Sequence, residues 1–295
     1  MTARTAAPVD DEGREVPIPG TVRRVVSIVP SLTEALEATA PGIVVGATDW
    51  CTHPGDLGAE RIRGTKNPDV ERIVALAPDL VVANQEENRL PDLDALRAAG
   101  LPVYVTDIRD VDGGLASLGR LLAACGLGEP GWLREARELW AAVEPASPRR
   151  RAVVPIWRRP WMAVGSDTFT GAVLERLGID NALAGSPERY PRIDPAALPE
   201  HDEPYLFTFT GAVLERLGID NALAGSPERY PRIDPAALPE HDLVVLPDEP
   251  YLFTADDGPE AFDAPSALVS GRLLTWYGPS LVEAARELPA ALGTR

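Results

Sequence analysis

The sequence predicts an α/β protein of two lobes, each built around a parallel sheet, with one helix joining them. Short apolar runs alternate with helical patterns in both halves of the chain, which is the order of β-α-β units. The apolar runs are continuous rather than alternating, as in strands that helices cover on both faces. Between the halves, residues 129–145 form a helical pattern bounded by Pro130 and Pro145.

The first lobe is predicted over residues 20–127. Ser31 and Glu34 form an S-x-x-E pattern that favours a helix start directly after the first strand. Asp69 is placed to cap the next helix, and Pro78 ends it. The expected strands are 24–29, 43–47, 80–83 and 103–106, and helices are expected to begin near 30, 70, 92 and 115.

The joining helix is predicted within residues 128–147, and the second lobe over 148–295. At a rise of ~1.5 Å per residue this helix is roughly 20 Å long, which is enough to bridge two lobes. In the second lobe we expect strands over 152–157 and 243–246, a short strand at 273–274, and helices over 170–177 and 279–288.

The second lobe contains a duplication, because residues 168–202 and 208–242 are identical. Repeat architectures have three or more diverged units, so two undiverged copies do not indicate a repeat fold. Removing 40 residues restores a regular order of strand, helix, proline-rich loop and strand. We therefore expect one copy to pack as the native helix and loop, and the other to sit at the edge or protrude.

Composition excludes several classes of function. The net charge of −17 argues against nucleic-acid and anionic-membrane binding, since both need a basic surface. No stretch reaches the ~18 apolar residues of a membrane span, and residues 1–20 lack the apolar core of a secretory signal. For the chain as it stands we therefore expect a cytoplasmic location. Cys51 and Cys125 show neither metal-site nor disulfide-framework spacing.

A polar cluster, residues 84–88, follows the predicted strand 80–83. In open α/β sheets the ligand crevice lies outside the carboxyl ends of the strands. Asn84, Gln85 and Glu86 are therefore candidate ligand-binding residues. The alternative is a solvated loop, because loops at strand ends are usually polar.

Large aromatic side chains also follow predicted strands. Large flat apolar ligands are held by aromatic side chains with a few polar anchors, although a tryptophan is more often part of a core. His53 is a candidate metal ligand through its neutral imidazole, or else a polar surface residue. The candidate aromatic residues are Trp50, Trp157, Trp161, Trp276 and Tyr277.

Sequence motifs of enzymes do not follow the predicted strands. The chain lacks the glycine-rich dinucleotide and phosphate loops and the G-x-S-x-G nucleophile turn, and it has 3 histidines. These observations disfavour catalysis. We expect no intrinsic cofactor and no resident metal.

Several segments together resemble the class III substrate-binding proteins of ABC transporters, which have a helical backbone. The chain is most similar to the cobalamin-binding branch. The resemblance implies two Rossmann-like lobes with parallel sheets, a single long backbone helix, little hinge motion, and a ligand held unchanged in the cleft between the lobes. It rests on RVVSIVPSLTEAL (24–36), VVGATDWCTHP (44–54), GTKNPDVERIVALAPDLVVANQEEN (64–88), ALRAAGLPVYVT (95–106), IWRRPWMAVGSDTF (156–169) and LLTWYGPSLVEA (273–284).

The resemblance also implies roles for single residues. Trp50 lies where the family has an aromatic side chain facing the corrin ring. Glu71 matches the glutamate that docks into an arginine pocket of the ABC permease, whereas the corresponding position of the second lobe holds Ala236, or Ala196 in the other copy. The family typically works outside the cytoplasm. The main hypothesis is a corrinoid-binding protein; the alternatives are a siderophore- or haem-binding protein and an enzyme with paired lobes.

Overall fold

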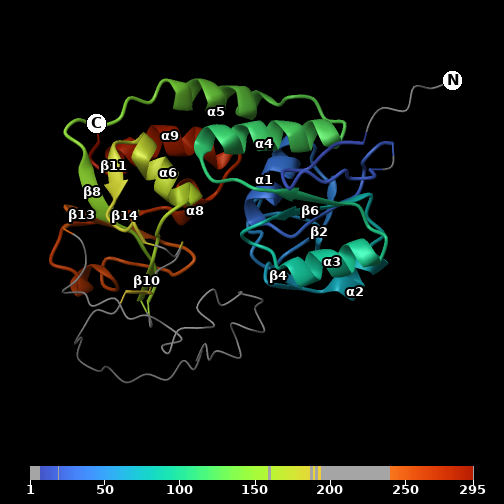
Figure 1. Cartoon of the computed structure of the whole chain (residues 1–295), viewed down its shortest axis with the longest axis horizontal. Helices are drawn as coiled ribbons and strands as arrows, with labels where there is room; N and C mark the ends of the chain where they lie inside the picture. Colours follow the sequence, from blue (N-terminus) through green and yellow to red (C-terminus); the bar gives the residue numbers. More distant parts are fainter. Residues whose placement is uncertain are drawn as a thin grey trace, which may run out of the picture.

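Two α/β lobes lie side by side in the computed structural model, with helices α4 (Val111–Ala124) and α5 (Gly131–Ala141) crossing above them (Figure 1). The structure describes residues 7–18, 20–158, 161–186, 189, 192–193 and 240–294. The predicted fold class, two lobes with parallel sheets joined by a helix, is confirmed.

The first lobe contains a five-stranded sheet of order β3-β2-β1-β6-β7, in which every pairing is parallel. Leu80 and Val82 of β6 belong to the core on one face, while Val81 and Ala83 belong to the core on the other. The continuous apolar run is thus buried on both faces, as predicted. The strands are β1 (Val25–Ser27), β2 (Val44–Ala47), β3 (Glu60–Arg61), β6 (Leu80–Asn84) and β7 (Val103–Thr106).

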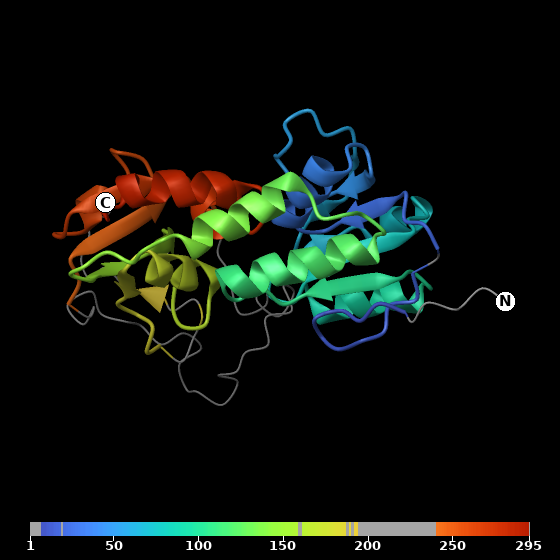
Figure 2. The same ribbon diagram turned by 90° about the horizontal axis from the view of Figure 1, so that it is seen from above.

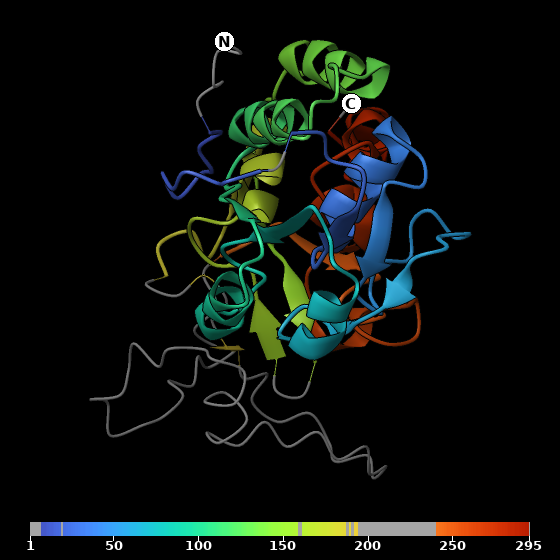
Figure 3. The ribbon, with the colours of Figure 1, turned by 90° about the vertical axis from the view of Figure 1, so that its right-hand side faces the viewer.

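Helices cover both faces of this sheet (Figure 3). On one side lie α1 (Pro30–Thr39) and α4; on the other lie α2 (Val70–Ala75) and α3 (Leu90–Ala98). Asp69 caps α2 as predicted, because its side chain accepts a hydrogen bond from the Arg72 amide. A small antiparallel pair, β4 (Arg63–Gly64) and β5 (Asn67–Pro68), leads into this helix.

The predicted capping box of α1 is wrong. The helix begins at Pro30, with Val29 as its N-cap and no side-chain cap. Proline has its backbone angle fixed near the helical value and needs no amide partner at the first position, so it starts the helix one residue before Ser31. The Glu34 side chain therefore does not cap the helix and instead accepts a hydrogen bond from Arg272 of the second lobe, as described below.

Helix α5 packs against helices of both lobes (Figure 2). Arg137 donates to the Leu115 carbonyl of α4 at 3.2 Å. The buried indole of Trp140 donates to the Leu281 carbonyl of α9 (Ser280–Ala291) at 2.9 Å. The domain boundaries at 127 and 147 stay a prediction.

The second lobe contains a parallel sheet of order β11-β8-β13-β14 and a separate antiparallel sheet of order β12-β10-β9. The predicted strand 152–157 is divided between them, because Pro155 has no amide hydrogen for the parallel ladder. The strands are β8 (Arg150–Val153), β9 (Pro155–Trp157), β10 (Trp161–Ala163), β11 (Ile179–Asn181), β12 (Arg192–Ile193), β13 (Leu243–Pro247) and β14 (Ser266–Val269).

Leu273 and Leu274 lie in a short helix, α8 (Gly271–Thr275), so the predicted strand there is wrong. Both side chains are buried, and an apolar pair alone does not distinguish a buried helix from a strand. The parallel sheet instead ends with β14, which the sequence pattern missed. A 3-10 turn, Pro259–Ala261, precedes it.

The first copy of the duplicated segment supplies helix α6 (Phe169–Arg176). Thr168 caps this helix by accepting from the Gly171 amide, and Val173 and Leu174 are fully buried in the core. Nearly all of the second copy falls in residues 194–239, outside the described residues. The placement of the second copy therefore stays a prediction.

Candidate functional site

The loops that follow strands of the first lobe meet two segments of the second lobe. Tyr277 donates from its hydroxyl to Oε1 of Glu87, beyond the end of β6, at 2.8 Å. The ring of Trp276 meets the ring of His53, beyond the end of β2, edge-on at 5.5 Å between centroids. The candidate site is therefore the region between the lobes at the carboxyl edge of the first sheet, where open α/β sheets bind ligands.

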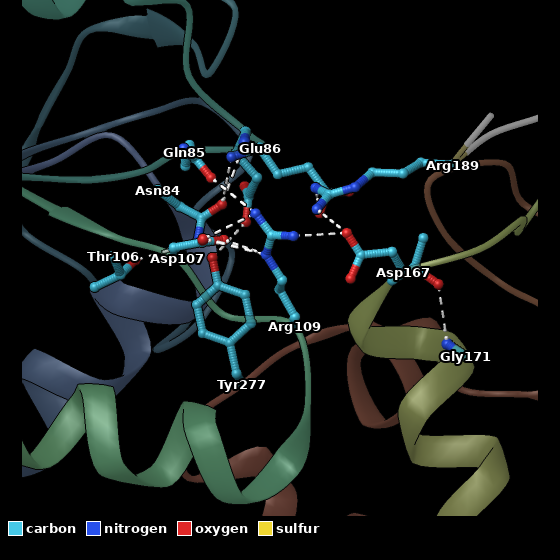
Figure 4. A network of polar contacts seen from close by, with 12 residues as sticks. Asn84, Gln85, Glu86, Thr106, Asp107, Arg109, Asp167, Gly171, Arg189 and Tyr277 are labelled. Atoms are coloured by element: carbon cyan, nitrogen blue, oxygen red, sulfur yellow. Dashed lines mark hydrogen bonds and ion pairs between the residues drawn. The ribbon is translucent and has the colours of Figure 1, made fainter. Parts of the chain in front are cut away.

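A charged network crosses between the lobes at this edge (Figure 4). Arg109, beyond the end of β7, donates to Oδ2 of Asp167 in the second lobe at 2.7 Å. Arg189 donates to the same oxygen at 2.8 Å and to Oε2 of Glu86 at 3.2 Å. Asp107 accepts from Nε of Arg109 at 3.0 Å. None of these three links, Arg109–Asp167, Arg189–Asp167 or Arg189–Glu86, was predicted from the sequence.

Gln85 belongs to the same network and is exposed. Its amide nitrogen lies 3.2 Å from Oδ1 of Asp107 in the orientation that satisfies both amide atoms. Gln85 and Glu86 thus lie directly beyond the end of β6, and their role in ligand binding stays a prediction.

Asn84 does not face the rim, in contrast to the prediction. It is 2% exposed, and its side chain accepts from the Glu86 amide and donates to the Thr106 hydroxyl. Asn88 holds the other end of the turn by donating to the carbonyls of Ile28 and Thr65. Asparagine stabilises turns through its own side chain in this way. Asn84 therefore positions Gln85 and Glu86 and does not itself present an atom to a ligand.

The segment 275–279 forms a buried contact between the lobes. Trp276 and Tyr277 are 8% and 5% exposed. Tyr277 also meets Phe169 of α6 edge-on at 5.6 Å. A Cβ atom at Gly278 would lie 3.3 Å from the Ser31 carbonyl, so glycine permits this close approach.

Burial shifts the pKa values of the titratable groups at this contact. Desolvation raises the pKa of Glu87 to about 7, against the smaller opposing effects of the Tyr277 hydrogen bond and Lys66. Desolvation likewise raises the pKa of Tyr277 well above its usual value. Desolvation lowers the pKa of Lys66, whose ammonium donates to the Glu86 carbonyl.

Glu34 forms a second polar contact between the lobes. Arg272 of α8 donates to Oε1 of Glu34 through Nε at 3.1 Å, and to Glu283 of α9 at 2.8 Å. Oε2 of Glu34 is buried, and no side chain or backbone group of the described residues forms a hydrogen bond with it. Burial raises the pKa of Glu34, with the arginine opposing the shift. This role was not predicted from the sequence, because Glu34 fits a helix-capping pattern.

Trp50 is 65% exposed and lies over the β4–β5 pair, where a Cβ atom at Gly64 would be 3.4 Å from its indole nitrogen. His53 is exposed, and its Nδ1 lies 3.1 Å from the Thr52 hydroxyl. His53 therefore presents its ring at the contact with Trp276, and Trp50 presents an exposed aromatic ring near Gly64.

Trp161 belongs to the core of the second lobe, in contrast to its prediction as an aromatic residue that faces a ligand. It is 3% exposed, stacks on Phe253 at 5.8 Å and meets Phe262 edge-on at 5.1 Å. Those partners lie about one hundred residues later in the chain, so no local pattern of the sequence predicts the contacts.

Trp157 is half-buried and packs edge-on against Tyr251 at 5.7 Å. The Tyr251 hydroxyl donates to Asp257 at 2.6 Å, and Asp257 also pairs with Arg158. Tyr251 was not predicted from the sequence, although it lies in the loop after strand β13. Trp157 and Tyr251 form a fixed, partly exposed aromatic pair.

The chain is similar to curated vitamin B12-binding proteins. It is 24% identical to that of Vibrio parahaemolyticus over 195 residues, 63% of this chain and 70% of that protein. It is 25% identical to that of Yersinia pestis over 181 residues, 58% of this chain and 63% of that protein. No protein-family model matches the chain.

Solved structures share its fold. The periplasmic vitamin B12-binding protein BtuF of Vibrio cholerae has a TM-score of 0.63 at 16% identity, covering 93% of this chain and 98% of that one. The periplasmic heme-binding protein RhuT of Roseiflexus sp. RS-1 has a TM-score of 0.65 at 18% identity, covering 92% and 98%. The chain has the periplasmic-binding fold.

The resemblance to helical-backbone substrate-binding proteins of the vitamin B12 branch is thus confirmed, and the relatives are named as binding proteins. Glu71, the predicted docking residue, is exposed in the first turn of α2. Among the residues that the structure describes, no three His, Cys, Asp or Glu side chains are arranged to hold a metal ion. None of the described helices combines the length and apolar character that crossing a bilayer needs.

Proposed function

We propose that this chain binds a corrinoid, a cobalamin-like ligand, between its lobes and releases it unchanged. The observation that carries the proposal is the agreement of two findings. The relatives found by sequence are vitamin B12-binding proteins. Aromatic and polar side chains of both lobes also meet at the carboxyl ends of the strands of the first sheet, where open α/β sheets bind ligands.

The proposed ligand-binding residues divide by chemistry. Aromatic faces hold a large flat ring system, and polar groups at the rim fix its orientation. The exposed indole of Trp50 is suited to the first role, since a tryptophan with this much exposure has no packing reason to be there. The proposed set is Trp50, His53, Gln85, Glu86, Trp157, Trp276 and Tyr277, with Asn84 and Trp161 as supporting residues.

A haem chelate is the second candidate ligand. Heme-binding proteins share the fold at TM-scores similar to that of the vitamin B12-binding structure. His53 is exposed beside the contact between the lobes, and a neutral imidazole is a common iron ligand. This observation favours haem over a siderophore, which brings a metal that is already fully coordinated.

Delivery to an ABC permease is the proposed setting, with Glu71 as the docking residue of the first lobe. Its position on an exposed helix face leaves it accessible to a partner. The structural neighbours are named as periplasmic proteins, which supports a site of action outside the cytoplasm for this chain as well.

Titration with cyanocobalamin and with haem, in separate experiments, tests the proposed function. Tryptophan fluorescence and the visible absorption band of the ligand report binding, and gel filtration reports co-elution. We expect saturable quenching and co-elution with the corrinoid. Haem binding alone would replace the first candidate with the second, and binding of neither macrocycle would overturn the proposal.

A further inference from the structure

We propose that Arg109 and Arg189 recognise an anionic oxygen on the ligand, with Asp167 as an internal competitor for the same guanidinium groups. This inference rests on the proposed function, since it names a chemical group on the bound macrocycle. It assigns specificity to charged residues at the rim rather than to the aromatic side chains.

The geometry of the three side chains carries the inference. A single oxygen, Oδ2 of Asp167, accepts from Arg109 at 2.7 Å and from Arg189 at 2.8 Å (Figure 4). Two guanidinium groups, one from each lobe, therefore converge on one anionic atom. Arginine donors arranged in this way match carboxylate and phosphate oxygens.

The two arginines are held in place by groups other than Asp167. Asp107 accepts from Nε of Arg109 with both carboxylate oxygens, at 3.0 and 3.1 Å. Glu86 accepts from Arg189 at 3.2 Å. Both guanidinium groups would therefore keep their orientation if Asp167 moved away.

Asp167 itself is weakly retained. Its side chain is 51% exposed, and its backbone has a φ of +52°, a conformation that is costly for most residues. An exposed carboxylate exchanges an arginine partner for water at little cost, because surface ion pairs contribute little net stability. A ligand anion can thus replace Asp167 without unfolding the segment before α6.

The chemistry of the candidate ligands gives two sources for the anionic oxygen. A complete cobalamin carries a phosphodiester in its nucleotide loop, and cobinamide lacks it. Haem carries two propionate carboxylates, and its dimethyl ester lacks their charge. The members of each pair share a ring and differ in the anion, which cobinamide loses together with the attached ribose and base. The change in preference between the wild type and the arginine variants therefore isolates the contribution of Arg109 and Arg189.

The test compares affinities for cyanocobalamin, dicyanocobinamide, haem and haem dimethyl ester. The variants are Asp167→Asn, Arg109→Gln, and Arg189→Gln combined with Arg229→Gln, since residue 229 is the duplicate of 189. Asparagine tolerates the positive φ, so Asp167→Asn removes charge without new strain. The matched controls are Asp180→Asn and Arg149→Gln, an exposed pair at the opposite, amino end of the second lobe's sheet.

We expect the wild-type protein to prefer the anionic member of one pair by about tenfold, the scale of a charge-assisted hydrogen bond. Arg109→Gln should abolish the preference, Asp167→Asn should increase it severalfold, and the controls should leave it unchanged. A preference within the corrinoid pair assigns the phosphodiester, and one within the haem pair assigns the carboxylate.

Binding of both members of each pair with equal affinity would overturn the inference and leave the proposed function standing. A preference that persists in Arg109→Gln and in the Arg189→Gln, Arg229→Gln variant would also overturn it. Binding of none of the four macrocycles would overturn the proposed function and the inference together.

Discussion

Replacement of Glu87 by glutamine should make the protein more stable above neutral pH and leave it unchanged in acid. The pKa of Glu87 is about 7 in the folded protein, because burial disfavours its charged form, against an ordinary value of 4.5. Because this pKa is raised in the folded state, the contribution of Glu87 to the free energy of unfolding is fully present below pH 4.5 and is lost as the pH rises through about 7. A glutamine side chain at this position carries no such titration.

The size of the effect follows from the two pKa values. A shift from 4.5 to about 7 corresponds to at most about 3.5 kcal/mol, at roughly 1.4 kcal/mol per pKa unit. Glu87 keeps partial contact with water, so we expect about half of this value. Lys66, Glu86 and Tyr277 are the groups that face it.

Urea unfolding followed by tryptophan fluorescence at pH 5 and pH 8.5 measures the effect. The free energy of unfolding of Glu87→Gln, relative to the wild type, should rise by about 1.5 kcal/mol between these two pH values. Glu175→Gln, on the exposed face of α6, is the control for the change in charge. A pH-independent difference, or a variant that loses stability at pH 8.5, would refute the assignment of the raised pKa to Glu87.

Three further outcomes are expected. Arg272→Met should lower the free energy of unfolding in urea by about 3 kcal/mol, because it leaves the Glu34 carboxylate buried and unpaired. Adding Glu34→Leu should restore most of this loss, and a double variant as unstable as the single one would contradict the reasoning. In calorimetric titration, Trp276→Ala should weaken corrinoid binding by roughly 1–3 kcal/mol. Trp161→Ala should chiefly lower the melting temperature of the protein. The reverse pattern would place Trp161 in the site. Deletion of residues 168–207 leaves 255 residues, 295 minus 40, and lets Thr208 replace Thr168 as the helix cap. That protein should resist urea at least as well and aggregate less, and earlier unfolding would show that both copies are needed.

The sequence by itself determined the fold class and most of the elements of the first lobe. Residues 80–83 of strand β6 form one continuous apolar run, and burial on both faces is what such a run requires. Asp69 caps α2 through a hydrogen bond to an amide three residues later, which a local pattern can reveal. Interactions within a few residues are encoded locally, so they were predictable.

Only the tertiary structure decided which side chains meet between the lobes. Glu34 and Arg272 are 238 residues apart in the chain, and Arg109 and Asp167 are 58 apart. Trp161 and Trp276 were both predicted to follow strands, yet Trp161 is enclosed by Phe253 and Phe262, whereas Trp276 meets His53 across the lobes. The partner of a side chain at a strand end depends on how the sheets face each other, and the packing of both lobes on α5 contributes to that arrangement.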